Sequence, residues 1–136
     1  MICTPGLRDL QAADALDELI GRVAEQKAPV PILLKIAPDL TDEEISDIVR
    51  IARHHKIQGL IISNTTLDRS AVSEHPSAYE AGGLSGRPLM DASTKLLSDI
   101  YKLAGDELVL VGVGGVSSGA DAYAKIRAGA SLVQLY

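Results

Sequence analysis

Short apolar runs and longer amphipathic stretches alternate along the chain. The apolar runs predict strands at residues 31–37, 59–64, 108–113 and 131–136. Helices are predicted at residues 12–27, 41–55, 88–104 and 118–128. A long polar segment, 65–87, interrupts this rhythm. Alternation of strands and helices indicates an α/β fold with a parallel sheet and right-handed crossovers.

Sequence signals also mark the ends of the predicted helices. Thr41 and Glu44 have the spacing of a capping box, and Ser118 is a typical helix cap. Pro88 is expected at the first position of the third helix, and Gly105 at its end. The positions expected to face the sheet are Leu16, Leu19, Ile20, Val23 and Ala24 in the first helix, Ile45, Ile48, Val49 and Ala52 in the second, and Leu96, Leu97, Ile100 and Leu103 in the third.

Two architectures accommodate this alternation. One is an open, doubly wound sheet, and the other is a (β/α)₈ barrel, of which four strands form half. Ligands bind at the C-terminal ends of the strands in both architectures. Candidate binding residues are therefore expected where the predicted strands end.

Composition narrows the class of protein. The 136 residues suffice for one domain with a core, and the net charge of −5 argues against nucleic-acid binding. The absence of Phe and Trp predicts a core of Leu, Ile, Val and Ala, typical of sheets buried on both faces. The single cysteine, Cys3, excludes an internal disulfide and a zinc site built on cysteines. The apolar runs are too short to span a bilayer and no signal peptide precedes the first helix, so we expect a soluble chain.

Lys35 lies inside the apolar run PILLKIA. An ammonium in such a strand must reach water or a charged group. One interpretation is a lysine at a strand end that extends into solvent. The other is a cation held against an anionic or electron-accepting ligand. The residue alone leaves both interpretations open.

Polar and glycine-rich stretches lie near the ends of the other strands. SNTT (63–66) offers hydroxyl and amide groups to a small polar ligand, although such residues are also common in turns. GGLSGRPL (82–89) and GVGGVSSG (112–119) place bare backbone N–H groups before a helix, which is typical of phosphate sites. Neither stretch matches a dinucleotide or nucleoside-triphosphate fingerprint. Two such clusters in successive strand–helix units predict a ligand that carries a phosphate.

Two other groupings are weaker candidates. His54 and His55 are adjacent at a helix end, where they do not face a common point, so no metal site is predicted. The stretch DRSAVSEH (68–75) contains Asp, Ser and His, but a catalytic triad depends on geometry rather than on proximity in sequence.

Together, the stretches TPGLRDLQ, KIAPDL, SNTT, GGLSGRPL and GVGGVSSGADAYAKIRAGASLVQLY resemble class 2 dihydroorotate dehydrogenase, the membrane-associated, quinone-using type. The resemblance covers essentially the whole chain. It implies that residues 1–136 form a single partial domain, the C-terminal half of a (β/α)₈ TIM barrel that holds FMN at its mouth. The implied activity is oxidation of dihydroorotate to orotate in pyrimidine synthesis, with electrons passed from FMN to quinone.

The resemblance also assigns the contacts with FMN. Lys35 and Ser63 are expected at the flavin ring, where the Lys35 charge would stabilise the reduced flavin. Gly86 and Gly115 are expected to lay their backbone against FMN, with Gly114 and Gly115 leaving room for its phosphate arm. Tyr136 is expected to supply a backbone contact near the phosphate. These residues form the implied cofactor site.

The resemblance places Asn64 and Thr65 on the substrate. It also exposes departures from the family pattern, whose catalytic base is a serine in a stretch before GLR. The chain reads MICTPGLR there; the serine is absent, and Cys3 does not align with it. No catalytic residue is therefore predicted, and the isolated chain is expected to be inactive. The family's first half-barrel and the helical pair that reaches the quinone and the inner membrane are also expected to lie outside this chain.

Two alternatives stay open at this point. The chain could belong to another FMN- or phosphate-binding barrel enzyme with a different substrate. It could also be a non-catalytic half-barrel. An uncovered apolar sheet face would then favour self-association or aggregation.

Overall fold

The computed structural model describes residues 12–26 and 29–136, so Cys3 and the TPGLRDLQ stretch lie outside the described residues. The helices are α1 (Ala13–Glu25), α2 (Asp42–His54), α3 (Met90–Ala104) and α4 (Gly119–Arg127). The strands are β1 (Leu33–Ile36), β2 (Gly59–Ile62), β3 (Val109–Val113) and β4 (Leu132–Gln134). All eight predicted elements are therefore confirmed. None of these helices combines the length and the hydropathy needed to cross a bilayer.

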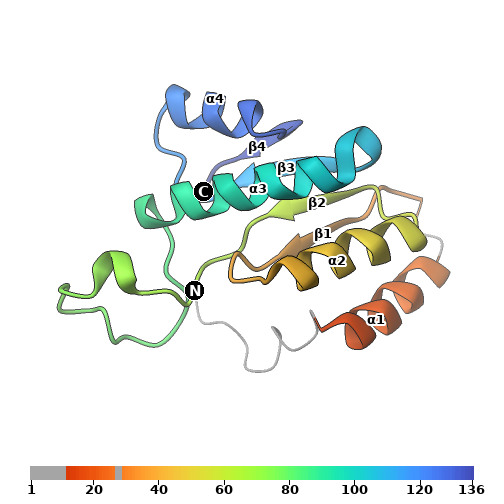
Figure 1. Ribbon diagram of the computed structural model, residues 1–136, viewed down its shortest axis with the longest axis horizontal. Helices are drawn as coiled ribbons and strands as arrows, with labels where there is room; N and C mark the ends of the chain where they lie inside the picture. The colour runs from red at the N-terminus through yellow and green to blue at the C-terminus, as the bar shows by residue number, and fades with distance from the viewer. Residues whose placement is uncertain (1–11, 27–28) are drawn as a thin grey trace.

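The four strands form one parallel sheet in the order β1-β2-β3-β4. Each crossover contains one helix, and the helices lie side by side along one face of the sheet (Figure 1). A doubly wound sheet would reverse its strand order and carry helices on both faces, so this arrangement matches part of a (β/α)₈ barrel. Ile62 pairs with Ile36 on one side and with Gly112 on the other. The C-terminal ends of the strands therefore meet at one edge.

The hydrophobic core lies between the sheet and the helices. Ile36, Leu60, Ile62 and Leu110 contribute fully buried side chains from the strands. The helices contribute Leu16 and Ile20 from α1, Ile45, Ile48, Val49, Ile51 and Ala52 from α2, and Leu96, Leu97, Ile100 and Ala104 from α3. This cluster consists of Leu, Ile, Val and Ala, as the composition predicted.

The predicted caps of α2 and α4 are both present. The N–H of Glu44 donates to the Thr41 hydroxyl at 3.3 Å, and the N–H of Thr41 donates to the Glu44 carboxylate at 2.7 Å. These reciprocal bonds complete the capping box. The Ser118 hydroxyl accepts from the N–H of Asp121 at 3.1 Å and caps α4.

Three predicted details of α1 and α3 are wrong. Pro88 lies in a 3₁₀ turn, Arg87–Leu89, and α3 begins only after it. Leu19 and Leu103 were expected to face the sheet, but they are 38% and 46% exposed. Ala104, one residue beyond Leu103, is buried in its place because it lies closer to the line of the inward stripe.

The face of the sheet opposite the helices is only partly apolar. Val109 and Leu132 lie on this face with 41% and 58% of their surface exposed. Lys35 on β1 and Gln134 on β4 are exposed and polar. The uncovered face of the sheet is therefore less apolar than the composition suggested, because β1 and β4 each place a polar residue on it.

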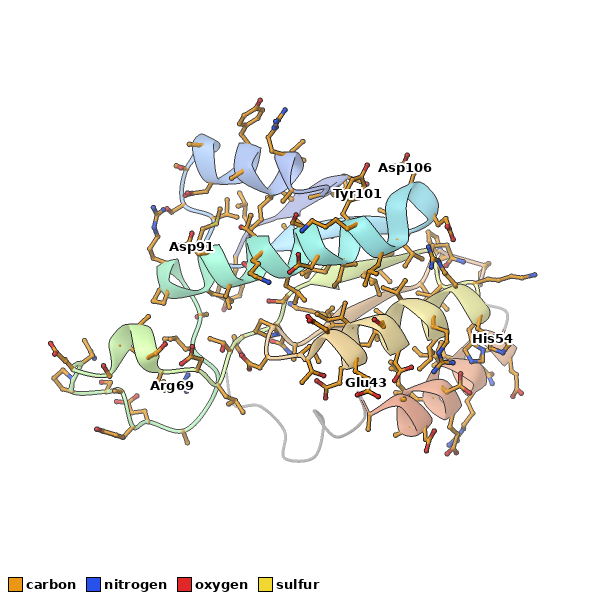
Figure 2. The ribbon with its side chains drawn as sticks, viewed as in Figure 1. Glu43, His54, Arg69, Asp91, Tyr101 and Asp106 are labelled. Atoms are coloured by element: carbon orange, nitrogen blue, oxygen red, sulfur yellow. The ribbon has the colours of Figure 1, made fainter. Side chains whose placement is uncertain are left out.

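The polar segment between β2 and α3 projects from the C-terminal edge of the sheet. It is the light-green loop at the lower left of Figure 1. Thr66 and Leu84 pair as an antiparallel bridge, with N–H···O distances of 3.1 and 2.8 Å. Arg69, labelled in Figure 2, donates to the carbonyls of Thr66 and Gly82 and so links the two arms. The segment therefore returns to the edge of the sheet where it began.

Candidate functional site

A cleft of about 330 Å³ opens at the C-terminal edge of the sheet. The residues that line it come from the ends of all four strands and from both glycine-rich stretches. Every residue predicted for the cofactor and substrate lines this one cleft: Lys35, Ser63, Asn64, Thr65, Gly86, Gly115 and Tyr136. The structure thus brings together residues that are separated by up to a hundred positions in the sequence.

Lys35 supplies a positive charge to the cleft. It lies on β1 on the face opposite the helices, where it pairs in register with Ile61. Among the described residues its ammonium has no carboxylate within 4.0 Å. The side chain is exposed at the cleft. The exposure agrees with a lysine that extends into solvent, and its position at the cleft leaves the role toward an anionic ligand as a prediction.

The SNTT stretch continues β2 into the cleft. The N–H of Ser63 donates to the carbonyl of Val113 at 3.2 Å, and that of Asn64 donates to the carbonyl of Ile36 at 2.7 Å. These bonds extend the pairing of the sheet past the end of β2 on both sides. Ser63 is buried, and its hydroxyl donates to the Asn64 carbonyl at 2.9 Å. Its neighbours Asn64 and Thr65 are partly exposed at the cleft and are oriented by the rigid strand behind them.

The first glycine-rich stretch forms the turn before α3. Gly86 has φ +80°, a conformation that side chains rarely adopt, and no neighbouring atom would obstruct a Cβ there. Its backbone conformation alone therefore favours glycine. The carbonyl of Gly86 accepts from the N–H of Leu89 at 3.0 Å, which closes the 3₁₀ turn at the start of α3.

The second glycine-rich stretch packs directly against the start of α3. A Cβ on Gly115 would lie 2.7 Å from the Met90 Cβ, and one on Gly114 would lie 2.9 Å from a Leu89 methyl. The expectation that these glycines leave room for a phosphate arm therefore gave the wrong reason. Their missing side chains admit the first turn of α3, because the Cβ positions point toward the helix.

Two backbone N–H groups of this stretch differ from the others in their hydrogen bonding. Among the described residues, the N–H groups of Gly115 and Val116 have no backbone or side-chain acceptor. Both residues line the cleft. They directly precede α4, whose N-terminal end carries partial positive charge. Backbone donors that precede a helix are a common means of binding anions in proteins, so the predicted phosphate site stays a prediction here.

Asp121 joins the two glycine-rich stretches. Its carboxylate accepts from the N–H and the hydroxyl of Ser117, each at 3.0 Å. It also accepts from the guanidinium of Arg87, which belongs to the first stretch, at 3.1 and 3.2 Å. Hydrogen bonds from Ser117 and Ser118, with the Arg87 charge, lower the pKa of Asp121 to about 2. The carboxylate is therefore ionised at neutral pH and fixes the two loops relative to each other.

Sequence reasoning missed Asp121, Arg87 and a buried lysine, Lys125. Arg87 lies inside a quoted motif, and Asp121 occupies the third position after the Ser118 cap, which is an ordinary place for an acidic residue. One signal was present: α4 lacks the inward hydrophobic stripe of the other helices. A helix that covers a sheet without such a stripe indicates that polar groups occupy its inner face.

The remaining candidates lie apart from the cleft. Figure 2 shows His54 at the right of the view, at the C-terminal end of α2. Asp91, at the start of α3, lies at the left of the same view. His55 contacts Asp17 of α1 at 2.9 Å, so it joins two helices. In the 68–75 stretch, the Asp68 carboxylate accepts from Ser70 at 2.8 and 2.9 Å, which is local turn chemistry.

Comparison with known proteins identifies the family. A model of the family described as dihydroorotate dehydrogenase matches residues 3–136. The chain belongs to the dihydroorotate dehydrogenase family. It is 57% identical over 134 residues to the dihydroorotate dehydrogenase (quinone) of Parvibaculum lavamentivorans, covering 98% of this chain and 38% of that protein. It is 50% identical to the mitochondrial dihydroorotate dehydrogenase (quinone) of Oryza sativa, covering 98% of this chain and 30% of that protein.

Solved structures of the family share the fold. The structure of DHODH from Eimeria tenella in complex with ferulenol matches with a TM-score of 0.90 and 38% identity, covering 98% of this chain and 41% of that chain. The ligand-free form from the same organism matches with a TM-score of 0.87. The resemblance to quinone-dependent dihydroorotate dehydrogenases is thereby confirmed. The chain spans between 30% and 41% of the length of these relatives.

Proposed function

We propose that this chain is the C-terminal half of the barrel of a quinone-dependent dihydroorotate dehydrogenase, and that its cleft holds FMN and part of the substrate site. In this proposal residues 1–136 form one partial domain. The complete enzyme oxidises dihydroorotate to orotate in pyrimidine synthesis and passes the electrons to quinone. The observation that carries the proposal is the convergence of all seven predicted residues on one cleft at the C-terminal edge of the sheet.

The donor set of the cleft fits FMN. The N–H groups of Gly115 and Val116, which have no acceptor among the described residues, suit a phosphate, and Gly86 and Tyr136 border the same space. Lys35 and Ser63 lie toward β1 and β2, where a flavin ring would be held. Bound FMN would supply the acceptor for the hydride that leaves dihydroorotate. Lys35 would stabilise the negative charge that develops on the ring.

Asn64 and Thr65 would bind the substrate. The Asn64 side-chain oxygen accepts from the N–H of Thr65 at 2.9 Å, which fixes the amide plane at the cleft. An amide so oriented presents its remaining donors to carbonyl or carboxylate oxygens of dihydroorotate. Both residues hold and orient the substrate, and neither is assigned a proton transfer.

The proton that leaves dihydroorotate requires a base, and this chain offers none in the expected place. Its motif reads MICT where the family has its serine, and Cys3 lies outside the described residues. We therefore propose that this chain alone is inactive. Quinone binding and association with the inner membrane would depend on segments of the complete enzyme that this sequence does not contain.

The proposal is tested on the full-length protein and on this chain alone. The full-length protein should purify with the visible absorbance of a flavin and should oxidise dihydroorotate with a quinone acceptor. Lys35→Met should slow flavin reduction by about a hundredfold, because one electrostatic partner of the ring is lost. The chain alone should bind FMN weakly and show no turnover.

A full-length protein that binds no flavin would contradict the assignment of FMN. One that binds flavin but oxidises a different substrate would support the rival barrel enzyme. Tight FMN binding and turnover by this chain alone would contradict the proposal that the isolated chain is inactive. It would mean that two copies rebuild a complete barrel mouth.

A further inference from the structure

Lys125 is a lysine in the interior of the protein with no role in the mechanism above. It lies on the inward face of α4 and is fully buried. Its aliphatic part lies over Gly112 of β3: a Cβ on Gly112 would be 3.0 Å from the Lys125 Cβ and 3.2 Å from its Cδ. The missing side chain of Gly112 therefore makes room for the aliphatic part of Lys125, which extends past β3 toward α3.

The ammonium of Lys125 ends at the first turn of α3. It donates to the Ser93 hydroxyl at 2.5 Å and to the Met90 carbonyl at 3.4 Å. Within the described residues no carboxylate lies within 4.0 Å of it. Asp91 of α3 and Asp121 of α4 are the acidic groups that face it from a distance, and Asp121 is already bound to Arg87.

This position is unfavourable for a cation. Burial lowers the pKa of Lys125 to about 8. The N-terminal end of α3 also carries partial positive charge, which opposes an ammonium. An anion bound nearby would offset this cost.

The cleft lies directly beyond the groups that Lys125 contacts. The Ser93 hydroxyl is 3.3 Å from the carbonyl of Gly114, and Met90 is the residue against which Gly115 packs. Gly114 and Gly115 both line the cleft. The ammonium therefore lies on the α3 side of the second glycine-rich stretch, whose Gly115 and Val116 N–H groups have no acceptor among the described residues.

We propose that Lys125 acts through the second glycine-rich stretch to select a ligand that carries a phosphate over the same ligand without one. The proposal rests on the assignment of FMN to the cleft. The buried charge raises the positive potential at the N–H groups of Gly115 and Val116, because the protein interior around Lys125 screens the charge less than water would. Lys125 is a positioning residue, because one layer of backbone separates it from the ligand.

The test compares FMN with riboflavin, which differs only in lacking the phosphate. Dissociation constants of both flavins are measured by fluorescence on the full-length protein stripped of flavin. Lys125→Met keeps the length and the apolar stem and removes the charge. We expect FMN to bind about tenfold more weakly and riboflavin to bind as before. Lys95→Met removes an exposed lysine of α3 that pairs with Asp99, and it should change neither constant.

The thermal stability of the stripped protein separates electrostatics from packing. A buried charge replaced by an apolar group of similar size often leaves a protein equally or more stable. Lys125→Met should therefore not lower the melting temperature of the stripped protein. Equal losses for FMN and riboflavin, together with a lower melting temperature, would show a structural role only and would overturn the proposal.

Proton uptake on flavin binding tests the proposal on the wild-type protein alone. A phosphate bound across the loop should raise the pKa of Lys125, so FMN binding at pH 8 should take up part of a proton and riboflavin binding should not. Calorimetry in two buffers of different ionisation enthalpy measures this uptake. Equal uptake with both flavins would overturn the proposal.

A further pair of outcomes separates this proposal from the assignment of FMN. Ser93→Ala keeps the charge of Lys125 and removes the hydroxyl, and it should preserve the preference for FMN over riboflavin. Loss of that preference would assign the selection to the hydroxyl and overturn the role of the charge. Wild-type protein that binds FMN tightly, combined with unchanged selectivity in Lys125→Met, would overturn only the role of Lys125. Wild-type protein that binds neither flavin would overturn both.

Discussion

Helices α2 and α4 cover the same face of the sheet, yet they present opposite kinds of side chain to it. The buried residues of α2 are Ile45, Ile48, Val49, Ile51 and Ala52. Those of α4 are Asp121 and Lys125. Both helices begin at a hydroxyl cap, so their ends do not account for the difference. The comparison teaches that α2 holds the fold together, whereas α4 holds the two glycine-rich stretches around the cleft.

The largest expected difference between the two helices is in core packing. Ile48→Ala in α2 removes a fully buried side chain and should lower the free energy of unfolding by about 3 kcal/mol. Ile126→Ala in α4 truncates a side chain of the same type that is 46% exposed, and it should cost less than about 1 kcal/mol. Denaturant unfolding of both variants measures the difference. Equal losses would break the division of roles between the helices.

The next effect is a pH dependence that only α4 should show. The pKa of Lys125 is lowered from 10.5 to about 8, so the folded state binds fewer protons than the unfolded state between these values. Stability should therefore rise with pH in this window, because the cost of the buried charge disappears as the lysine loses its proton. Between pH 8 and pH 10 the free energy of unfolding of the wild type should rise by about 2 kcal/mol more than that of Lys125→Met. The other titrating groups are the same in both proteins, so their contributions cancel in this difference. The same pH profile in both proteins would contradict the buried charge.

A smaller effect should be common to both helices. Thr41→Ala and Ser118→Ala each remove a hydroxyl that accepts a hydrogen bond from the helix backbone. Each should lower the free energy of unfolding by about 1 kcal/mol. Thermal unfolding of the two variants tests the claim that the helices differ in their inward faces and not in their caps. A cost confined to one cap would weaken it.

The same comparison explains what the sequence could predict. The period of the hydrophobic residues and the Thr41–Glu44 capping box predicted α2 almost to the residue, because these signals are local. The caps of α4 were also local and were predicted. The inward positions of Asp121 and Lys125 were not, since their partners Arg87 and Ser93 belong to another helix-forming segment about thirty residues earlier.

The site shows the same limit. That the seven candidate residues line one cleft could be predicted because the C-terminal ends of parallel strands meet at one edge, and because the motifs resemble a known family. The reason for Gly114 and Gly115 was wrong, because only the folded chain shows that Leu89 and Met90 occupy the space where their side chains would be. Leu103 was placed inward by its period, and the crossing of α3 over the sheet buries Ala104 instead.

The central claim is that FMN binds in the cleft between the two glycine-rich stretches. Amide hydrogen exchange of the full-length protein, with and without FMN, tests it most directly. Residues 83–87 and 112–118 should gain protection when FMN is added, with Gly115 and Val116 gaining most because their N–H groups have no acceptor among the described residues. Residues 56–58, at the opposite edge of the sheet, should not change. Protection at residues 56–58 without any at 112–118 would contradict the account.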